Sequence, residues 1–188
     1  MSMRRNLLIG LGVFVALVAA VTAISAGKTS ERANAPQLSA SEPTGRGSGG
    51  ARGEVAAFTA KDVDGRIVRV RTGTPGALFF FAGWCGSCIP EAKALDRVER
   101  TLGSRVAITA IDSDPSDSIE SIRRFQQQVG TPRYSFVWDS SGKLGAQFAV
   151  LALDTTIIYD AKGKVVFRDA APTDVETLRA AFRQAGVQ

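Results

Sequence analysis

The chain has 188 residues, of which 45% are hydrophobic and 22% are charged, a balance typical of a globular protein rather than a disordered or collagen-like one. Its formal net charge is +5, but residues 1–53 carry six Lys and Arg against two Glu, whereas residues 54–188 carry seventeen against sixteen acidic residues. Because the excess of basic residues lies mostly in residues 1–53 and no nucleic-acid-binding motif accompanies it, we expect no nucleic-acid partner.

The chain contains no histidine and only two cysteines. The absence of histidine excludes cysteine–histidine proteases, histidine-based hydrolases and ordinary zinc sites. A single pair of cysteines cannot complete a four-ligand zinc site, so we expect neither a metal nor a cofactor. The chemistry of this protein therefore has to come from cysteine or carboxylate side chains.

The N-terminal segment contains eighteen consecutive residues without a charge, Leu7–Ile24. As a helix this stretch is about 27 Å long, which matches the hydrocarbon thickness of a bilayer. We therefore predict a transmembrane anchor within residues 1–26; the alternative is a signal segment that is removed after export. Arg4 and Arg5 favour a cytoplasmic N-terminus, so the rest of the chain would face the periplasm or the cell exterior.

Residues 27–53 are rich in Ser, Gly, Ala and Pro, and such a composition cannot bury enough apolar surface to fold. We interpret them as a flexible linker and predict one folded domain over residues 54–188.

The pattern in this domain alternates between strands and helices. Residues 55–60 and 66–71 flank Asp64–Gly65 and predict a hairpin, and the apolar run at residues 77–82 predicts a strand buried on both faces. The remaining predicted elements are a helix over residues 87–102, a strand over 105–112, a helix from Pro115 to Gly130, a strand over 136–138, a short helix over 143–148, a hairpin of 155–160 with 164–168, and a last helix opened by a capping box at Thr173–Glu176. This order predicts an α/β fold with a central mixed sheet and helices on its faces.

Both cysteines fall where the buried strand gives way to the first helix, in the stretch Trp84–Cys88. Their spacing allows a disulfide, and the positive end of a helix lowers the pKa of a thiol placed there. We expect Cys85 to be the exposed nucleophile and Cys88 to resolve the mixed disulfide. A purely structural bridge is the alternative, but so small a loop removes little unfolded-state entropy.

The residues Trp84-Cys-Gly-Ser-Cys88, preceded by the segment Phe58–Gly65 and followed by Thr155–Gly163, resemble the thioredoxin-like superfamily. In particular, they resemble membrane-tethered thiol-disulfide oxidoreductases of the TlpA/ResA type. This resemblance implies a thioredoxin fold with an extra N-terminal hairpin, outside the cytoplasm. It also implies exported cysteine-containing clients, such as apocytochrome c, and a membrane electron donor of the thioredoxin-reducing type.

The resemblance places Trp84, Asp154 and Thr155 at the substrate-binding edge, with three departures from the usual pattern. Asp154 stands where such proteins carry a cis-proline facing the cysteines, unless the loop is shifted by one residue and Asp154 points to solvent. Phe79 replaces a buried acid, so that protons would come from water, Asp154 or another acid such as Glu91. Lys93 replaces the usual helix proline.

The sequence thus favours an extracytoplasmic thiol-disulfide oxidoreductase, acting as a disulfide reductase rather than an oxidase, with a role in cytochrome c biogenesis. The alternative is a non-catalytic thioredoxin-fold binding module in which Asp154 has weakened the exchange site. Metal or cluster binding by Cys85 and Cys88 across a dimer is a weaker alternative. A peroxidase is weaker still, because no Pro-x-x-x-Thr/Ser-x-x-Cys pattern precedes Cys85.

Overall fold

The computed structural model describes residues 53–188. The predicted membrane segment and nearly all of the predicted linker lie outside these residues. Within the described range, none of the helices combines the length and the apolar character needed to cross a bilayer.

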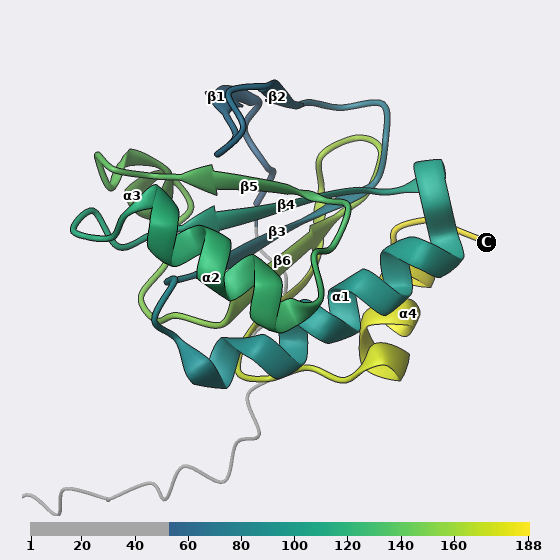
Figure 1. The fold of residues 1–188 in the computed structure, drawn as a ribbon. Coiled ribbons are helices and arrows are strands. Elements are labelled where there is room, and N and C mark those ends of the chain that lie inside the picture. The colour runs from purple at the N-terminus through teal and green to yellow at the C-terminus, as the bar shows by residue number, and fades with distance from the viewer. Residues whose placement is uncertain (1–52) are drawn as a thin grey trace, which may run out of the picture. The chain divides into compact units, whose positions relative to one another are not determined.

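The strands of the described domain form two sheets. The strands are β1 (Phe58–Lys61), β2 (Ile67–Val70), β3 (Gly76–Phe81), β4 (Ala107–Asp112), β5 (Ser135–Trp138), β6 (Thr155–Tyr159) and β7 (Val165–Ala170). β1 and β2 pair as an antiparallel hairpin, and the other strands form a mixed sheet in the order β5-β4-β3-β6-β7 (Figure 1). β3 is parallel to β4, as β4 is to β5, whereas β6 is antiparallel to both β3 and β7.

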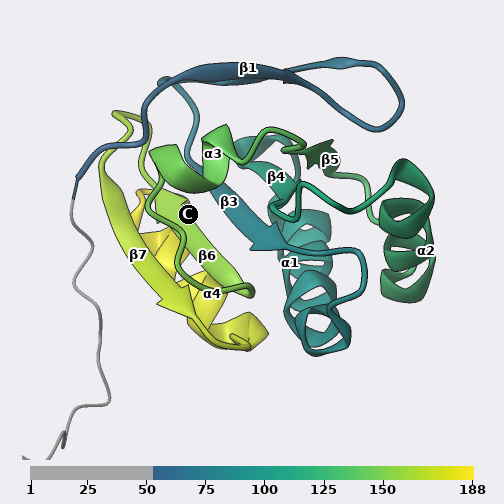
Figure 2. The same cartoon turned by 90° about the vertical axis from the view of Figure 1, so that its left-hand side faces the viewer.

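The helices cover both faces of the mixed sheet. They are α1 (Ile89–Leu102), α2 (Ile119–Val129), α3 (Lys143–Gln147) and α4 (Val175–Gln184). Because side chains alternate along a strand, Phe79 and Phe81 of β3 pack with α1, α2 and α4, while Leu78 and Phe80 pack with α3 and the hairpin. Figure 2 shows α3 and the hairpin on the side of the sheet opposite α1 and α4.

The predicted α/β architecture and the N-terminal hairpin are confirmed, but α2 and α4 do not start where predicted. α2 begins at Ile119 rather than Pro115, because the Ser118 hydroxyl caps it by accepting the Ser121 N–H, and Pro115 lies in the preceding turn. The cap of α4 is Asp174 rather than Thr173, since the Asp174 carboxylate accepts two N–H groups of the first turn.

Phe81→Ala should destabilise the fold strongly. Phe81 is fully buried and its ring packs against Phe125 and Phe136. Truncating a buried aromatic side chain costs about 3–5 kcal/mol of unfolding free energy, through lost apolar burial and the cavity left behind. Guanidinium unfolding measures this change. Ile67→Ala, at a side chain that is 47% exposed, should cost less than about 1 kcal/mol. Equal losses in both variants would contradict the assignment of the core.

Candidate active site

Cys85 and Cys88 lie in the connection between β3 and α1. Gly86–Cys88 form one turn of 3-10 helix, so the α-helix itself starts at Ile89, two residues later than predicted. The two cysteines form a disulfide with their Cα atoms 5.4 Å apart. Cys85 is 5% exposed and Cys88 is fully buried, so Cys85 is the more accessible of the two, as predicted.

The side chains of Ser87 and Trp84 lie beside Cys85 in this turn. The hydroxyl of Ser87 lies 3.4 Å from the sulfur of Cys85, within reach of a hydrogen bond to sulfur. Trp84 is 66% exposed, and its indole N–H donates to Asp114 Oδ2 at 2.7 Å. The tryptophan therefore presents an apolar surface beside Cys85, and a hydrogen bond fixes one edge of its ring.

A cavity of about 240 Å³ lies beside Cys85, between the start of α1 and α2. Trp84 and Ile89 line it on one side, and Arg124 and Phe125 line it on the other. A side chain next to a cysteine in a partner protein has room here, among apolar side chains, the polar side chains of Ser121 and Gln128, and one cation.

Glu91 is buried in the first turn of α1, three residues after Cys88, which places both on one side of the helix. Glu91 Oε1 accepts the Thr156 hydroxyl at 2.5 Å, and Oε2 accepts the Thr173 N–H at 3.3 Å. Burial, reinforced by the negative charge of Asp154, raises the pKa of Glu91 to about 8. Glu91 is therefore a protonated carboxylic acid at neutral pH.

Asp154 precedes β6 and is only 5% exposed, so it does not point to solvent. Its φ angle is +64°, and residues 53–188 contain no cis peptide bond. Neither of its carboxylate oxygens has a hydrogen-bond partner in the described part of the chain, and burial raises its pKa as well. Because its charge acts on Glu91, the two buried carboxyl groups form a pair that one proton stabilises.

The other predicted site residue of this segment, Thr155, is buried, and its hydroxyl donates to the carbonyl oxygen of Ala152 at 2.7 Å. Its side chain is thus used within the loop. Phe79, which replaces the buried acid of thioredoxins, is fully buried in the core.

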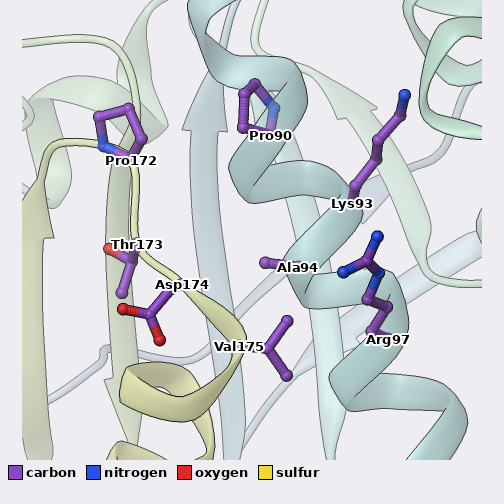
Figure 3. Close-up of a pocket in the computed structure, with 8 residues that line it drawn as sticks. All are labelled: Pro90, Lys93, Ala94, Arg97, Pro172, Thr173, Asp174 and Val175. Atoms are coloured by element: carbon purple, nitrogen blue, oxygen red, sulfur yellow. The ribbon is translucent and has the colours of Figure 1, made fainter.

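A second hollow, of about 400 Å³, lies between α1 and the residues that lead into α4 (Figure 3). Its floor is apolar, and Lys93 and Arg97 lie one turn apart along α1 at its edge. Thr173 lines this hollow and also donates its N–H to Glu91. The hollow therefore adjoins the buried acid that follows the cysteines.

Reasoning from the sequence missed two acidic residues, one at the end of β4 and one in the loop that follows it. Asp112 and Asp117 both accept the N–H of Gly83, two residues before Cys85. Their only sequence signal is the repeated aspartate in the loop between β4 and α2, which is also common in ordinary turns.

Comparisons with known proteins agree with this geometry. A sequence model described as the AhpC/TSA family matches residues 52–168. The protein called Mercury resistance operon ORF3 of Streptomyces lividans is 33% identical over 150 residues, covering 78% of this chain and 79% of that protein. The thiol:disulfide interchange protein DsbE of Xylella fastidiosa is 30% identical over 93 residues, but the match spans only 45% of its length and 50% of this chain.

Among solved structures, a thio-disulfide isomerase from Thermus thermophilus is similar with a TM-score of 0.60 and 28% identity, covering 72% of this chain and 96% of that one. This likeness confirms the predicted thioredoxin-like fold.

Glu91→Gln should weaken the pH dependence of stability. The pKa of Glu91 rises from an ordinary 4.5 to about 8 on folding, so the folded chain binds more protons than the unfolded chain between these values. The stabilisation is complete below the lower value and is lost as the pH rises through the upper one. Denaturant unfolding from about pH 5 to about pH 9 should therefore show that the free energy of unfolding falls more steeply with pH for the wild type than for Glu91→Gln.

Asp154→Asn should move the loss of stability with rising pH to lower pH, because the neutral amide no longer raises the pKa of Glu91. Asparagine also tolerates the positive φ of this position. Glu120→Gln, at an exposed residue of α2, removes one negative charge elsewhere and should follow the wild type. Parallel pH curves for the wild type and Glu91→Gln would rule out a raised pKa at Glu91.

Proposed function

The chain belongs to the AhpC/TSA family of thioredoxin-like proteins, and we propose that it is an extracytoplasmic oxidoreductase that reduces disulfides in exported client proteins. Its relatives include thiol:disulfide interchange proteins, which supports clients that contain cysteine. The observation that carries the proposal is the Cys85–Cys88 disulfide at the start of α1, with its more accessible sulfur beside a cavity and the exposed Trp84.

In the reduced protein, Cys85 is the nucleophile. The N–H groups at the start of the helix and the Ser87 hydroxyl stabilise its thiolate. The thiolate attacks one sulfur of a client disulfide, the client S–S bond breaks, and the departing client thiolate takes up a proton. Trp84 and the backbone edge at Asp154–Thr155 hold the client during this step.

Cys88 then resolves the mixed disulfide. Its thiol loses a proton, and its sulfur attacks Cys85 Sγ, which releases the second client thiol and forms the Cys85–Cys88 disulfide. Two electrons pass to the client, and the client takes up two protons. Glu91 exchanges these protons: a pKa of about 8 lies close to that of a free thiol, so proton transfer between the two groups costs little.

The catalytic cycle closes when an electron donor in the membrane reduces the Cys85–Cys88 disulfide. We propose that residues 1–26 anchor the chain with its N-terminus in the cytoplasm, and that residues 27–53 act as the linker to the domain. Such a tether raises the effective concentration of domain, donor and clients near the membrane. Apocytochrome c is the client that the family resemblance favours, and secretion after cleavage of the N-terminal segment is the alternative to anchoring.

A binding module without catalysis is the second candidate, and the conformation of Asp154 favours it. In place of a proline, this position has a buried aspartate with a φ angle of +64°. Proline cannot adopt a positive φ, so the backbone edge that would grip a client differs from that of a proline-containing thioredoxin fold. The two candidates differ in whether the cysteine pair cycles.

The reduction potential of the full chain separates these candidates. Equilibration in dithiothreitol or glutathione buffers, followed by trapping of free thiols, should reveal a reversible two-electron couple with a potential near or below about −270 mV, as expected for a reductant. A value near about −120 mV would identify an oxidant instead. Without a reversible couple, the binding module would replace the enzyme.

Matched cysteine variants test the assigned order of the two sulfurs. Cys88→Ser should accumulate a mixed disulfide with a client peptide, because Cys85 attacks and nothing resolves the product. Cys85→Ser should accumulate far less, because Cys88 is fully buried. The opposite pattern would reverse the two roles.

A further inference from the structure

Gly83, two residues before Cys85, packs against the start of α2. A Cβ atom on Gly83 would lie 2.6 Å from Ser121 Oγ and 2.9 Å from Asp117 Oδ2, closer than real Cβ contacts. No larger residue fits here without movement of the backbone or of these side chains. The turn that carries Trp84 and Cys85 is therefore in direct contact with the first residues of α2 and the loop before it.

Two carboxylate oxygens meet at the N–H of Gly83. This nitrogen donates to Asp112 Oδ2 at 2.8 Å and to Asp117 Oδ2 at 2.7 Å. One hydrogen cannot balance two full negative charges, and two ionised carboxylates this close repel each other strongly when solvent is largely excluded. A proton shared between the two oxygens removes the repulsion and adds a hydrogen bond.

Asp112 is the member of the pair that carries this proton. Asp112 is fully buried at the end of β4, and burial together with the nearby charge of Asp117 raises its pKa to about 7. For Asp117, burial acts in the same direction, but hydrogen bonds from Ser121, Ser118 and Gly83 outweigh it and lower its pKa. Asp112 therefore donates its O–H to an ionised Asp117.

No Lys or Arg among residues 53–188 forms an ion pair with either acid. The charged residues on the surrounding elements are Asp114 in the same loop, Asp139 after β5, and Glu120, Arg123 and Arg124 on α2, of which Arg123 pairs with Asp64. None of the ion pairs formed by residues 53–188 includes Asp112 or Asp117. The positive groups that these two carboxylates contact are backbone and hydroxyl hydrogens, so the shared proton carries the neutralisation.

We propose that Asp112 and Asp117 are positioning residues whose shared proton holds the Gly83–Cys85 turn against α2, and that loss of this proton loosens the turn and places a second negative charge beside it. The role goes beyond the proposed oxidoreductase function. Only the measurement of thiol reactivity described below depends on that function.

Tryptophan fluorescence can report on the protonation of Asp112. Both of its tryptophans donate to Asp114, which lies between the two acids: Trp84 to the carboxylate at 2.7 Å and Trp138 to the backbone oxygen at 3.1 Å. The chain has no histidine, and cysteines in a disulfide do not titrate. Among residues 53–188, burial raises the pKa of Asp112 to about 7 and that of Glu91 to about 8.

The test is a pH titration of tryptophan fluorescence in the oxidised full chain. The wild type should show a transition near pH 7, which Asp112→Asn abolishes because its amide donates to Asp117 at every pH. Asp117→Asn should move the transition to lower pH, because the charge that raises the pKa of Asp112 is gone. This second variant keeps the test decisive if Asp112→Asn folds poorly. Glu91→Gln and Glu120→Gln should retain the wild-type transition.

A second readout follows the reactivity of Cys85 in the reduced protein. At about pH 8, iodoacetamide should alkylate Cys85 about threefold faster in Asp112→Asn than in the wild type, a change equal to about half a pKa unit of the thiol. The cause is the missing negative charge beside the turn. An unchanged fluorescence transition in both aspartate variants, or its loss in Glu91→Gln, would overturn the proposal. Because the fluorescence titration needs no catalytic turnover, its result would still hold if the proposed redox function were wrong.

Discussion

The burial of carboxyl groups without cationic partners is the constraint on which this structure depends. Glu91, Asp112 and Asp154 are each at most 5% exposed, and none takes part in an ion pair of the described domain. An ionised carboxylate in such a place costs several kcal/mol, which would consume much of the stability of a small domain. These groups are tolerable only where protons and donated hydrogen bonds neutralise them, so the stability of the folded domain depends on pH.

The strand register explains why these acids lie beside the cysteines. Phe81, the last residue of β3, pairs with Asp112 at the end of β4, because the two strands are parallel and end together. The antiparallel β6 begins opposite Phe80 with Thr155, so Asp154 falls at the same edge of the sheet. Loops that leave one edge of a sheet bring distant residues together, and this edge is where α/β folds commonly place their chemistry.

The sequence predicts the elements that have a strong local signal. The apolar strand before Trp84, the turn residues of both hairpins and the glycines that end α1 and α2 each act through the backbone or through burial, and one sequence displays them. The start of α2 was misplaced because Pro115 and Ser118 both suit a helix start, and the choice depends on where Asp114 and Asp117 find partners. The same two carboxylates also accept hydrogen bonds from Trp84 and Gly83 in the turn after β3, far away in the sequence, so the local pattern alone did not decide between the two positions.

Only the part of the site that has a local sequence signal was predictable. Cys85 and Cys88 follow from their spacing, but the environment of Asp154 depends on burial, which a sequence does not give. In a chain without histidine, groups that exchange protons near neutral pH have to be made from shifted carboxylates or thiols. Glu91 and Asp112 are shifted by burial on opposite sides of the β3–α1 connection, one bonded to β6 and the other to the turn itself. In the roles that we propose, Glu91 exchanges protons with the cysteines during disulfide exchange, and the proton on Asp112 holds the turn that carries Cys85.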